Sequence, residues 1–461
     1  MYVHVDITFA YLRTVARYVQ SSGDMEFLRA HWSNVQAAYR YCVSLIDPAT
    51  GLPTIPSDKE GANEQERMRD DLGLSSSWVA AAEGFAQMAE TMRSPEAASA
   101  TRAAEAAEAA MASSSWDASR HFWIGGHLSN GQALDEQRPH PLAVLAQHVF
   151  SDAQIQEILD HIASPDFQSD WGTRTLSASS QHFDPDSYGA GSVSALGSAD
   201  VAASFWQYHR PLTAWQIWHR LLPWNTLDSE GHIHEVLAGD FYHPEKESVP
   251  EQTWSSAGYL SAAVQGMLGL SVHVSEHGVT FAPHLPAEWG QISVRHVRVG
   301  ASTLRLRLSR DLQGITLEAV NEGDPVAFTF SPEIPLGASL KGASLAKDAG
   351  SATEVPARVD MHSQDEHATV VFQASTGATR CHITYEGGLQ IEAPASRPAI
   401  GAGSRDMELS SVSLAGRTLT IEAFVNSQGP SALDLHTVWQ PSRIEGGRGG
   451  HYTQRRIVIR F

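Results

Sequence analysis

The residues best suited to chemistry stand in the segment from Gly231 to Leu270, where a lone carboxylate, an acidic and aromatic loop and a helix led by Trp254 follow one another. Glu235 lies between Gly231 and Gly239, in a stretch too short and too glycine-broken to form a helix. We therefore expect its carboxylate to project from a loop over a pocket, where it can act as a general base. The segment is typical of the rim of a sugar-binding cleft.

Hydrolysis of a glycosidic bond generally needs a second carboxyl group, which protonates the leaving oxygen. The acidic segment 56–74 supplies six candidates, namely Asp58, Glu60, Glu64, Glu66, Asp70 and Asp71. Glu64 is favoured because its small neighbours Gly61 and Ala62 would let a substrate approach closely. Carboxylates directly before a helix usually form a solvated first turn stabilised by the helix dipole, and this is the role we expect of Asp70 or Asp71.

A third segment combines groups that bind sugar hydroxyls. Asp170, Trp171 and Arg174 supply a carboxylate, an aromatic ring and a guanidinium in a glycine-kinked loop. Tyr188 begins a glycine-rich turn that leads into a helix. Such a turn could hold phosphate instead, but it lacks the lysine and the spacing of a phosphate-binding loop.

Most of the 12 tryptophans precede residue 270. Those inside apolar helical stripes are expected to fill the core, and they are Trp78, Trp206, Trp215 and Trp218. Those in loops or at helix starts are expected to face the cleft, and they are Trp116, Trp123, Trp171, Trp224 and Trp254.

No metal or other cofactor is predicted. His232, His234 and His243 could ligate a metal beside Glu235, but no HExxH or other tight ligand spacing is present, so hydrogen bonding to sugar hydroxyls is the favoured interpretation. Cys42 and Cys381 stand too far apart in the sequence for a disulfide framework or a cysteine zinc site.

The composition excludes several classes of partner. A formal net charge of -20 at pH 7 disfavours nucleic acid and anionic membrane surfaces, and no apolar run approaches the roughly 20 residues that span a bilayer. The chain is predicted to be soluble and to have a carbohydrate substrate as its partner. The first residues, MYVHVDITFAYLRTVARYVQ, lack the basic region of a signal peptide and begin almost inside a helix, which suggests a fragment. The oligomeric state stays open, and so does the compartment, which is the bacterial cytoplasm, or the periplasm or exterior if an upstream signal has been lost.

A helical period dominates the first part of the chain. Phe9, Leu12 and Ala16 begin an amphipathic helix, with Asp6 or Thr8 as its cap and Gly23 as its stop, and Asp24 can cap the next. Further helices are expected at 78–92, 94–113, 140–148, 151–163, 198–209 and 211–222, and after Trp254. Paired helices with long loops on one side are typical of an (α/α)6 toroid, here with fewer helices than six hairpins need and so possibly incomplete at the N-terminus.

Beyond Leu270 the period changes to two. Leu304, Leu306 and Leu308 alternate with arginines, and several later runs such as GITLEAV and LTIEAFV are strand-like. The sequence therefore predicts three parts: a mostly α toroid at 1–272, an all-β sandwich at 273–392, and an additional β-rich segment, possibly truncated, at 393–461.

Several of these pieces together resemble the amylo-α-1,6-glucosidase domain of glycogen debranching enzyme, within the six-hairpin glycosidases. The similar pieces are DITFAYLRTVARYVQSSGDMEFLRAHW, SDWGTRTLS, SYGAGSV, EVLAGDF and SVPEQTWSSAGYLSAAVQGMLGL, with GVTFAPHLPAEWGQISVRHVRVG as the β-rich tail. The resemblance implies an inverting pair of carboxylates, with the base just upstream of the Gln-Trp-Ser segment at the place of Glu235 and the acid closest to Glu64. Tyr188-Gly189-Ala190-Gly191 replaces the usual Tyr-His-Gln-Gly turn of debranching enzymes.

The expected function is therefore hydrolysis of an oligosaccharide or polysaccharide, with Glu64 and Glu235 as catalytic residues. The residues expected to shape the sugar site are Asp6, Asp170, Trp171, Arg174, Tyr188, Gln252 and Trp254. Three alternatives stay open. A polysaccharide lyase would use Tyr188, His182 and Arg174, a carbohydrate-binding protein would lack catalysis, and a phosphorylase would depend on phosphate.

Overall fold

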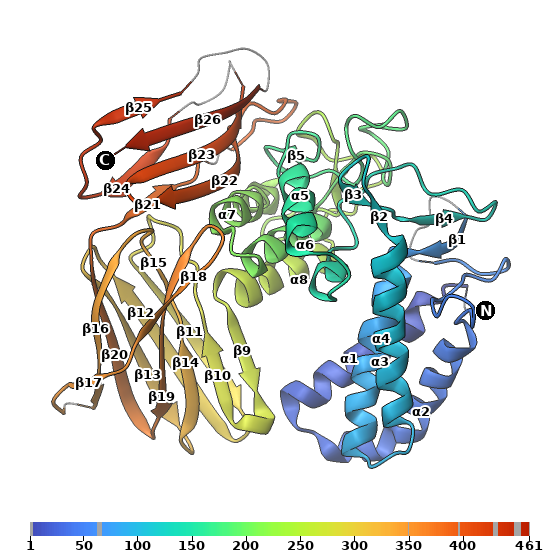
Figure 1. Cartoon of the computed structure of the whole chain (residues 1–461), viewed down its shortest axis with the longest axis horizontal. Helices are drawn as coiled ribbons and strands as arrows, with labels where there is room; N and C mark the ends of the chain where they lie inside the picture. Colours follow the sequence, from blue (N-terminus) through green and yellow to red (C-terminus); the bar gives the residue numbers. More distant parts are fainter. Residues whose placement is uncertain are drawn as a thin grey trace. The chain divides into compact units, whose positions relative to one another are not determined.

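The computed structural model describes residues 3–61, 67–348, 350–394, 397–426, 432–446 and 453–460. The chain divides into two compact units (Figure 1). Unit 1 consists of Met1–Ile162 with Thr175–Phe183, and unit 2 consists of Ala163–Arg174 with Asp184–Phe461. We describe each unit by itself.

Unit 1 is built from helical hairpins. Its helices are α1 (Asp6–Ser22), α2 (Met25–Ser44), α3 (Leu72–Thr91), α4 (Ala97–Ser114) and α5 (Asp152–Ile162). The predicted apolar stripe of α1 is buried, and α1 ends at Gly23, whose φ of 67° suits glycine. Asp24 caps α2 by accepting a hydrogen bond from the backbone N–H of Phe27, as predicted. The expected cap of α1 is wrong, because α1 begins at Asp6 itself and Val5 in front of it has no capping side chain.

Close packing holds these hairpins together. A Cβ atom on Gly84 of α3 would lie 2.7 Å from the Cβ of Ala16 on α1, so only glycine permits this approach. The rings of Tyr39 and Phe85 stack at 3.8 Å between centroids, and Trp78 is 1% exposed beside them. The prediction that Trp78 fills the core is confirmed.

The helix expected at 140–148 is wrong. Only a short 3-10 turn forms there, Leu142–Ala146. The apolar run is a single turn long, which is too short for a stable α-helix, and it lies between Pro141 and His148, whose φ is positive. The remaining elements of unit 1 are short strands that close its loops, namely β1 (Met68–Asp71), which pairs with β4 (Gly126–Leu128), and β2 (Trp116–Asp117), which pairs with β3 (Phe122–Trp123).

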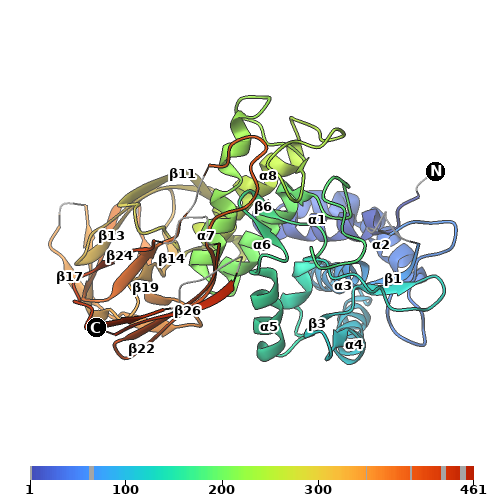
Figure 2. The same cartoon turned by 90° about the horizontal axis from the view of Figure 1, so that it is seen from above.

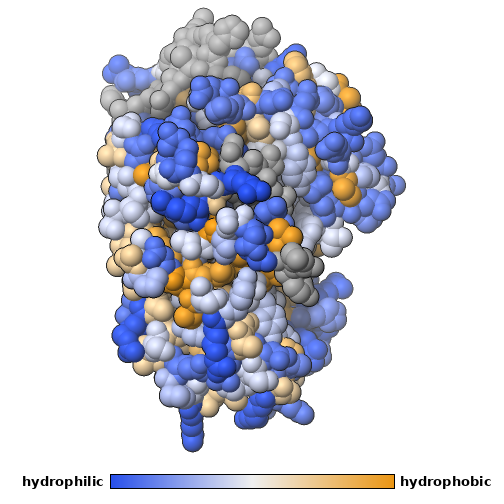
Figure 3. All heavy atoms as spheres, turned by 90° about the vertical axis from the view of Figure 1, so that its right-hand side faces the viewer, coloured by the Kyte–Doolittle hydropathy of each residue, from blue (hydrophilic) through white to orange (hydrophobic). Residues whose placement is uncertain are grey.

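The outer faces of α1 and α2 expose large apolar side chains. They are Ile7, Tyr11, Tyr18, Tyr41 and Val43. Figure 3 shows hydrophobic residues in the middle of the face seen from the right-hand side of Figure 1. None of the helices in the described part of the chain is long and apolar enough to cross a bilayer.

Unit 2 begins with a helical layer. It contains α6 (Ala195–Gln207), α7 (Pro211–His219) and α8 (Thr253–Ala262), which continues into the π-helical turn Ala263–Met267. Trp206, Trp215 and Trp218 are buried in this layer, as predicted. A Cβ atom on Gly266 would lie 2.5 Å from the Trp206 ring, so glycine lets α8 pack directly on the indole.

Two six-stranded sheets follow and share one apolar core. The first contains β15 (Glu333–Ile334), β19 (Glu366–Ala374), β14 (Val326–Phe330), β10 (Gly278–Phe281) and β9 (Leu270–His273), with β18 (Arg358–Met361) paired to β19. The second contains, in order, β11 (Gln291–Val299), β12 (Ser302–Arg310), β13 (Gly314–Glu322), β20 (Gly377–Glu386), β16 (Ser339–Lys347) and β17 (Thr353–Val355). The alternation predicted for β12 is confirmed, since its leucines are buried and its two central arginines are exposed.

A smaller C-terminal sheet completes unit 2. Its strands are β22 (Glu408–Ala415), β23 (Thr418–Val425), β26 (Thr453–Arg460) and β25 (Arg443–Glu445), and a separate ladder joins β21 (Leu389–Glu392) to β24 (Asp434–Thr437). Helix α7 packs on β22, and Figure 2 shows α7 beside the sheets. The Arg220 guanidinium donates a 2.5 Å hydrogen bond to Glu408. Both side chains are almost fully buried, with 0% and 2% exposure.

The architecture agrees with the coarse prediction. Helices occupy the N-terminal part, sheets occupy the C-terminal part, and the change falls between Met267 and Leu270. Eight α-helices lie in the described residues. Closure of such helices into a toroid of six hairpins stays a prediction, and so do the domain boundaries at 272 and 392.

Candidate active site

The backbone of Glu235 is held on both sides. Glu235 directly precedes β8 (Val236–Leu237), which pairs with β7 (Val193–Ser194). Its carbonyl accepts a hydrogen bond from the N–H of Ala195, the first residue of α6, and its N–H donates to the carbonyl of Val249. The side chain of Glu235 is half-buried. The loop position predicted for this carboxylate is therefore confirmed, and its main chain is fixed by neighbouring segments.

Tyr188 contacts this carboxylate. Its hydroxyl donates a 2.7 Å hydrogen bond to Oε1 of Glu235. Tyr188 stands in a tight turn that Ser192 closes, because the Ser192 hydroxyl donates to the Tyr188 carbonyl at 2.5 Å. The phenol is 45% exposed. The glycine-rich turn thus positions a proton donor on a partly exposed carboxylate, and this contact brings together two residues that the sequence analysis selected separately.

The Gln-Trp segment lies at the start of α8. Gln252 is the N-cap residue, and its side-chain oxygen accepts from the backbone N–H of Trp254. Trp254 is 70% exposed, so its indole has a face available for a ligand. Gln252 also donates its backbone N–H to the carbonyl of Ile233, two residues before Glu235. The start of α8 is therefore tied to the Glu235 segment.

His234, beside Glu235, belongs to the scaffold. His234 is 2% exposed, with its ring nitrogens facing the Ser248 hydroxyl at 3.2 Å and the Asp228 carboxylate at 2.9 Å. The side chain of Ser248 also accepts from the N–H of Val236. His234 thus lies beneath the segment, where it is not available to sugar hydroxyls.

Asp170 and Trp171 form the turn of a small hairpin between β5 (Gln168–Ser169) and β6 (Gly172–Thr173). The Asp170 carboxylate accepts hydrogen bonds from the backbone N–H groups of Arg405 and Asp406, and burial raises its pKa. Trp171 is 0% exposed and donates its indole N–H to the carbonyl of Ala238. In this structure Trp171 supports the loop that follows Glu235, and Asp170 binds the segment at Arg405 and Asp406. Their predicted contact with substrate stays a prediction.

Arg174 is also turned toward the backbone. Its guanidinium donates to the carbonyls of Gly239, Pro165 and Gln168. The residue is only 8% exposed. The recorded bonds of Arg174 therefore fix the loop that follows Glu235, and its substrate-binding role likewise stays a prediction.

The expectation that loop tryptophans face a cleft is wrong for Trp123 and Trp224. They are 4% and 0% exposed, and the indole N–H of Trp224 donates to the carbonyl of Trp171. These loops fold inward and use the large apolar rings as their own core. Trp254, in contrast, is exposed, as expected of a tryptophan that faces a cleft.

The acidic segment of unit 1 is described in part. Glu64 and Glu66 lie outside the described residues. Asp58 and Glu60 are exposed and form ion pairs with Lys59 and His4. Asp70 accepts hydrogen bonds from Arg69 and His127.

Asp71 differs from the other carboxyls in this segment. It is the N-cap residue of α3, where Oδ1 accepts from the N–H of Leu74 at 2.5 Å, but its burial differs from the solvated first turn expected of Asp70 or Asp71. The residue is 6% exposed, and Oδ2 has no hydrogen-bond partner among the residues that the structure describes. Burial raises the pKa of Asp71 to about 6, and the charges of Asp6 and Asp70 act in the same direction. A carboxyl that keeps its proton up to a pH of about 6 is suited to be a general acid in mildly acidic solution. The position of Asp71 before a helix did not reveal this raised pKa in the sequence.

Asp6, expected at the sugar site, is the first residue of α1. Its Oδ1 atom is buried without a hydrogen-bond partner in the described part of the chain, and Nδ1 of His4 lies 3.9 Å from it. Gly61 lies against the carboxylate of Asp71, since a Cβ atom on Gly61 would be 2.8 Å from Oδ2 of Asp71. Asp6, Gly61 and Asp71 therefore gather around one acidic position in unit 1.

Comparisons with known proteins agree with a glycosidase fold. Residues 57–195 match the family model described as the mannosylglycerate hydrolase MGH1-like glycoside hydrolase domain. This range includes the whole acidic segment from Asp58 to Asp71 and the Tyr188 turn. No curated protein sequence matches the chain significantly.

Two solved structures share the fold. A sialidase superposes with a TM-score of 0.56 at 11% identity, over 65% of this chain and 29% of that chain. An α-L-rhamnosidase from Dictyoglumus thermophilum superposes with a TM-score of 0.54 at 11% identity, over 82% of this chain and 39% of that chain. The chain thus spans well under half the length of both. Together with the family match, they support a six-hairpin glycosidase and do not extend to the amylo-α-1,6-glucosidase domain in particular.

Proposed function

We propose that the protein is a glycoside hydrolase that cleaves an oligosaccharide or polysaccharide with Glu235 as its general base. The observation that carries this proposal is the hydrogen bond from Tyr188 to Glu235, which holds a half-buried carboxylate on a rigid loop. The glycoside hydrolase match covers residues 57–195, which include Tyr188 and end before Glu235.

The reaction would use two carboxyl groups. The acid protonates the glycosidic oxygen as the bond to the anomeric carbon breaks, and Glu235 removes a proton from the water that attacks the opposite face of the sugar ring. In an inverting reaction the two carboxyls stand about 6.5–9.5 Å apart, which leaves room for this water. Tyr188 would keep Glu235 oriented, and Trp254 would offer an indole face to the sugar.

The general acid belongs to the segment between Asp58 and Asp71. Glu64 is the residue favoured by sequence. Asp71 is the alternative supported by its surroundings, because its raised pKa keeps the proton that an acid must donate. Replacing each residue separately by its amide distinguishes them.

The proposed substrate class is a neutral sugar. A lyase would need a cation to neutralise a uronate, and the guanidinium of Arg174 is already bonded to three backbone carbonyls. We do not narrow the proposal to the α-1,6-glucan specificity of debranching enzymes, because the family match is with another glycosidase domain.

The test is a panel of aryl glycosides and glucans, mannosides and rhamnosides included, incubated with the wild-type chain. Release of reducing sugar without phosphate dependence supports a hydrolase. Unsaturated products would identify a lyase, a requirement for phosphate would identify a phosphorylase, and calorimetric binding of sugar without cleavage would leave a carbohydrate-binding protein.

A further inference from the structure

A largely buried cluster of three imidazoles around one carboxylate lies in unit 2. Its members are His209, His284, Asp365 and His367. His209 lies between α6 and α7, His284 follows β10, and Asp365 and His367 stand at the start of β19. One ligand atom from each of the four residues lies within 4.8 Å of the others.

The distances to Asp365 are close to those between ligands of a small metal ion. Nδ1 of His209 is 2.9 Å from Oδ1, Nε2 of His284 is 3.3 Å from Oδ2, and Nε2 of His367 is 3.4 Å from Oδ2. Four ligands placed tetrahedrally at the usual zinc bond lengths are about 3.3 Å apart. The distances from the imidazoles to Asp365 already suit a bound ion. To bind it, the imidazoles would only have to shift slightly relative to one another.

His284 has no adequate protein partner. It is 7% exposed, and neither of its ring nitrogens makes a hydrogen bond, although Nε2 faces Asp365. Burying a polar group without a partner destabilises the folded chain. A cation between His284 and Asp365 would satisfy this nitrogen.

The ring of His367 is oriented for coordination. Its Nδ1 lies 2.5 Å from the carbonyl of Ser331, so Nδ1 carries the proton that it donates there. In the neutral ring, Nε2 then presents a lone pair to the Asp365 carboxylate, which is itself an acceptor. A histidine that donates one N–H to a backbone carbonyl and presents the other nitrogen to the site is the usual outer support of a metal-bound imidazole.

The carboxylate of Asp365 faces the imidazoles of His209, His284 and His367. The ring of His362 stacks on His209 at 3.4 Å between centroids without joining the ligand set. A second carboxyl, Glu333, lies nearby. Burial raises the pKa of Glu333, and the charge of Asp365 acts in the same direction.

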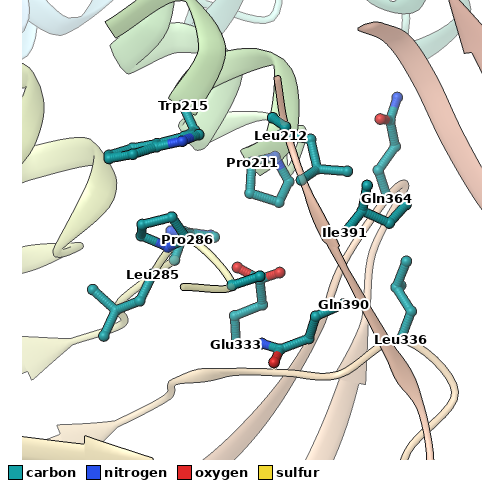
Figure 4. A pocket seen from close by; sticks show the side chains of 13 residues that line it. Pro211, Leu212, Trp215, Leu285, Pro286, Glu333, Leu336, Gln364, Gln390 and Ile391 are labelled. Atoms are coloured by element: carbon teal, nitrogen blue, oxygen red, sulfur yellow. The ribbon is translucent and has the colours of Figure 1, made fainter. Parts of the chain in front are cut away.

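A cavity gives an ion a way to approach. It is lined by His284, Glu333 and Gln364, together with apolar residues of α7 and β21 such as Leu212 and Ile391. Figure 4 shows the side chain of Glu333 extending among Pro286, Gln390 and Trp215 in this cavity.

We propose that His209, His284, Asp365 and His367 bind one divalent cation of the zinc class at a closed, structural site. Three imidazoles and one carboxylate suit zinc, whereas calcium and magnesium prefer oxygen ligands. Four protein ligands leave no open position, so the ion stabilises the fold and does not take part in hydrolysis. It joins the loop between α6 and α7 to the ends of β10 and β19. This departs from the sequence analysis, which predicts no metal.

The experiment uses the full chain, stripped with a chelator and titrated with Zn²⁺ and, separately, with Co²⁺. We expect one zinc per chain by elemental analysis, a higher unfolding temperature with zinc, and the visible absorption of tetrahedral Co²⁺. H284Q is expected to weaken zinc binding by at least about 100-fold. H362Q, which changes the imidazole stacked on His209, is the matched control and keeps the affinity.

Three results would overturn the proposal: a folded wild-type chain that takes up no zinc, cobalt bound without a tetrahedral spectrum, or an H284Q chain that binds zinc as wild type does. If H284Q does not fold, the cobalt spectrum of the wild-type chain decides the question. None of these outcomes depends on glycosidase activity, so the metal site and the proposed reaction are tested independently.

Discussion

The phenol of Tyr188 donates a 2.7 Å hydrogen bond to the carboxylate of Glu235, across 47 residues of sequence. A tight turn places the phenol, and the β7–β8 ladder with the start of α6 places the carboxylate. The donor and acceptor therefore come from two separately stabilised segments of unit 2. A carboxylate held in one orientation is prepared to receive a proton from a bound water.

Removing this hydrogen bond should slow catalysis while the fold remains. For Y188F we expect kcat to fall about 10-fold, because a hydrogen bond to a charged group contributes roughly 1.5 kcal/mol or more. The measurement is steady-state kinetics on the best substrate of the panel.

Y242F is the matched control. The Tyr242 hydroxyl is buried and has no hydrogen-bond partner, so its removal should leave kcat unchanged. Equal kcat values for Y188F and wild type would show that the contact does not orient the base.

Replacing Asp71 tests whether it is the general acid. D71N keeps the helix cap, because asparagine caps helices as well as aspartate does, but it removes the proton donor. If Asp71 is the acid, kcat falls about 100-fold or more in D71N, and wild-type activity declines as the pH rises through about 6, where Asp71 loses its proton.

E64Q gives the comparison in the same segment. A large loss in E64Q with near-normal activity in D71N would assign the acid to Glu64 and leave Asp71 as a cap only.

The buried pair of Arg220 and Glu408 should contribute strongly to the stability of unit 2. Removing one partner leaves a buried charge uncompensated, so R220M is expected to lower the free energy of unfolding by about 3–5 kcal/mol. The measurement is urea unfolding followed by circular dichroism.

The exposed pair of Arg305 and Glu322 is a matched control, with N and O atoms 2.9 Å apart. R305M should change stability by less than about 1 kcal/mol. Similar losses in R220M and R305M would contradict the importance assigned to burial.

Glu245 should make stability depend on pH. Burial raises its pKa to about 7, with nearby Asp186 acting in the same direction. Because the folded chain then holds a proton that the unfolded chain has released, stability falls as the pH rises from about 4.5 to 7, by at most about 3 kcal/mol.

E245Q should remove this part of the pH dependence and be more stable than wild type at pH 8, with little difference at pH 4. E230Q changes an exposed carboxyl of the same unit and should follow the wild-type curve. An E245Q curve that parallels wild type would refute the assignment.

Local sequence signals predicted local structure well. The cap at Asp24 and the stop at Gly23 are readable because each acts on backbone groups a few residues away. The alternation in β12 is readable because one face of the strand is buried throughout. Glu235 could be selected because glycines exclude a helix around it.

Contacts between distant segments could not be predicted in this way. Trp224 occupies a loop, yet its ring packs inward beside Trp171, because burial depends on how loops fold together. The parallel pairing of β10 with β14 and the gathering of His209, His284 and Asp365 join segments with no characteristic spacing. The raised pKa of Asp71 comes first from its burial and then from the charge of Asp6, which lies in another helix.

The central claim is that Glu235 is the catalytic base, and E235Q tests it most directly. Hydrolysis of a substrate that the wild type cleaves should fall by about 100- to 10,000-fold in E235Q, with an unchanged unfolding temperature, while E247Q keeps its activity. Proton NMR of the first-formed wild-type product should show inversion at the anomeric carbon. An E235Q chain that retains full hydrolytic activity would contradict the account.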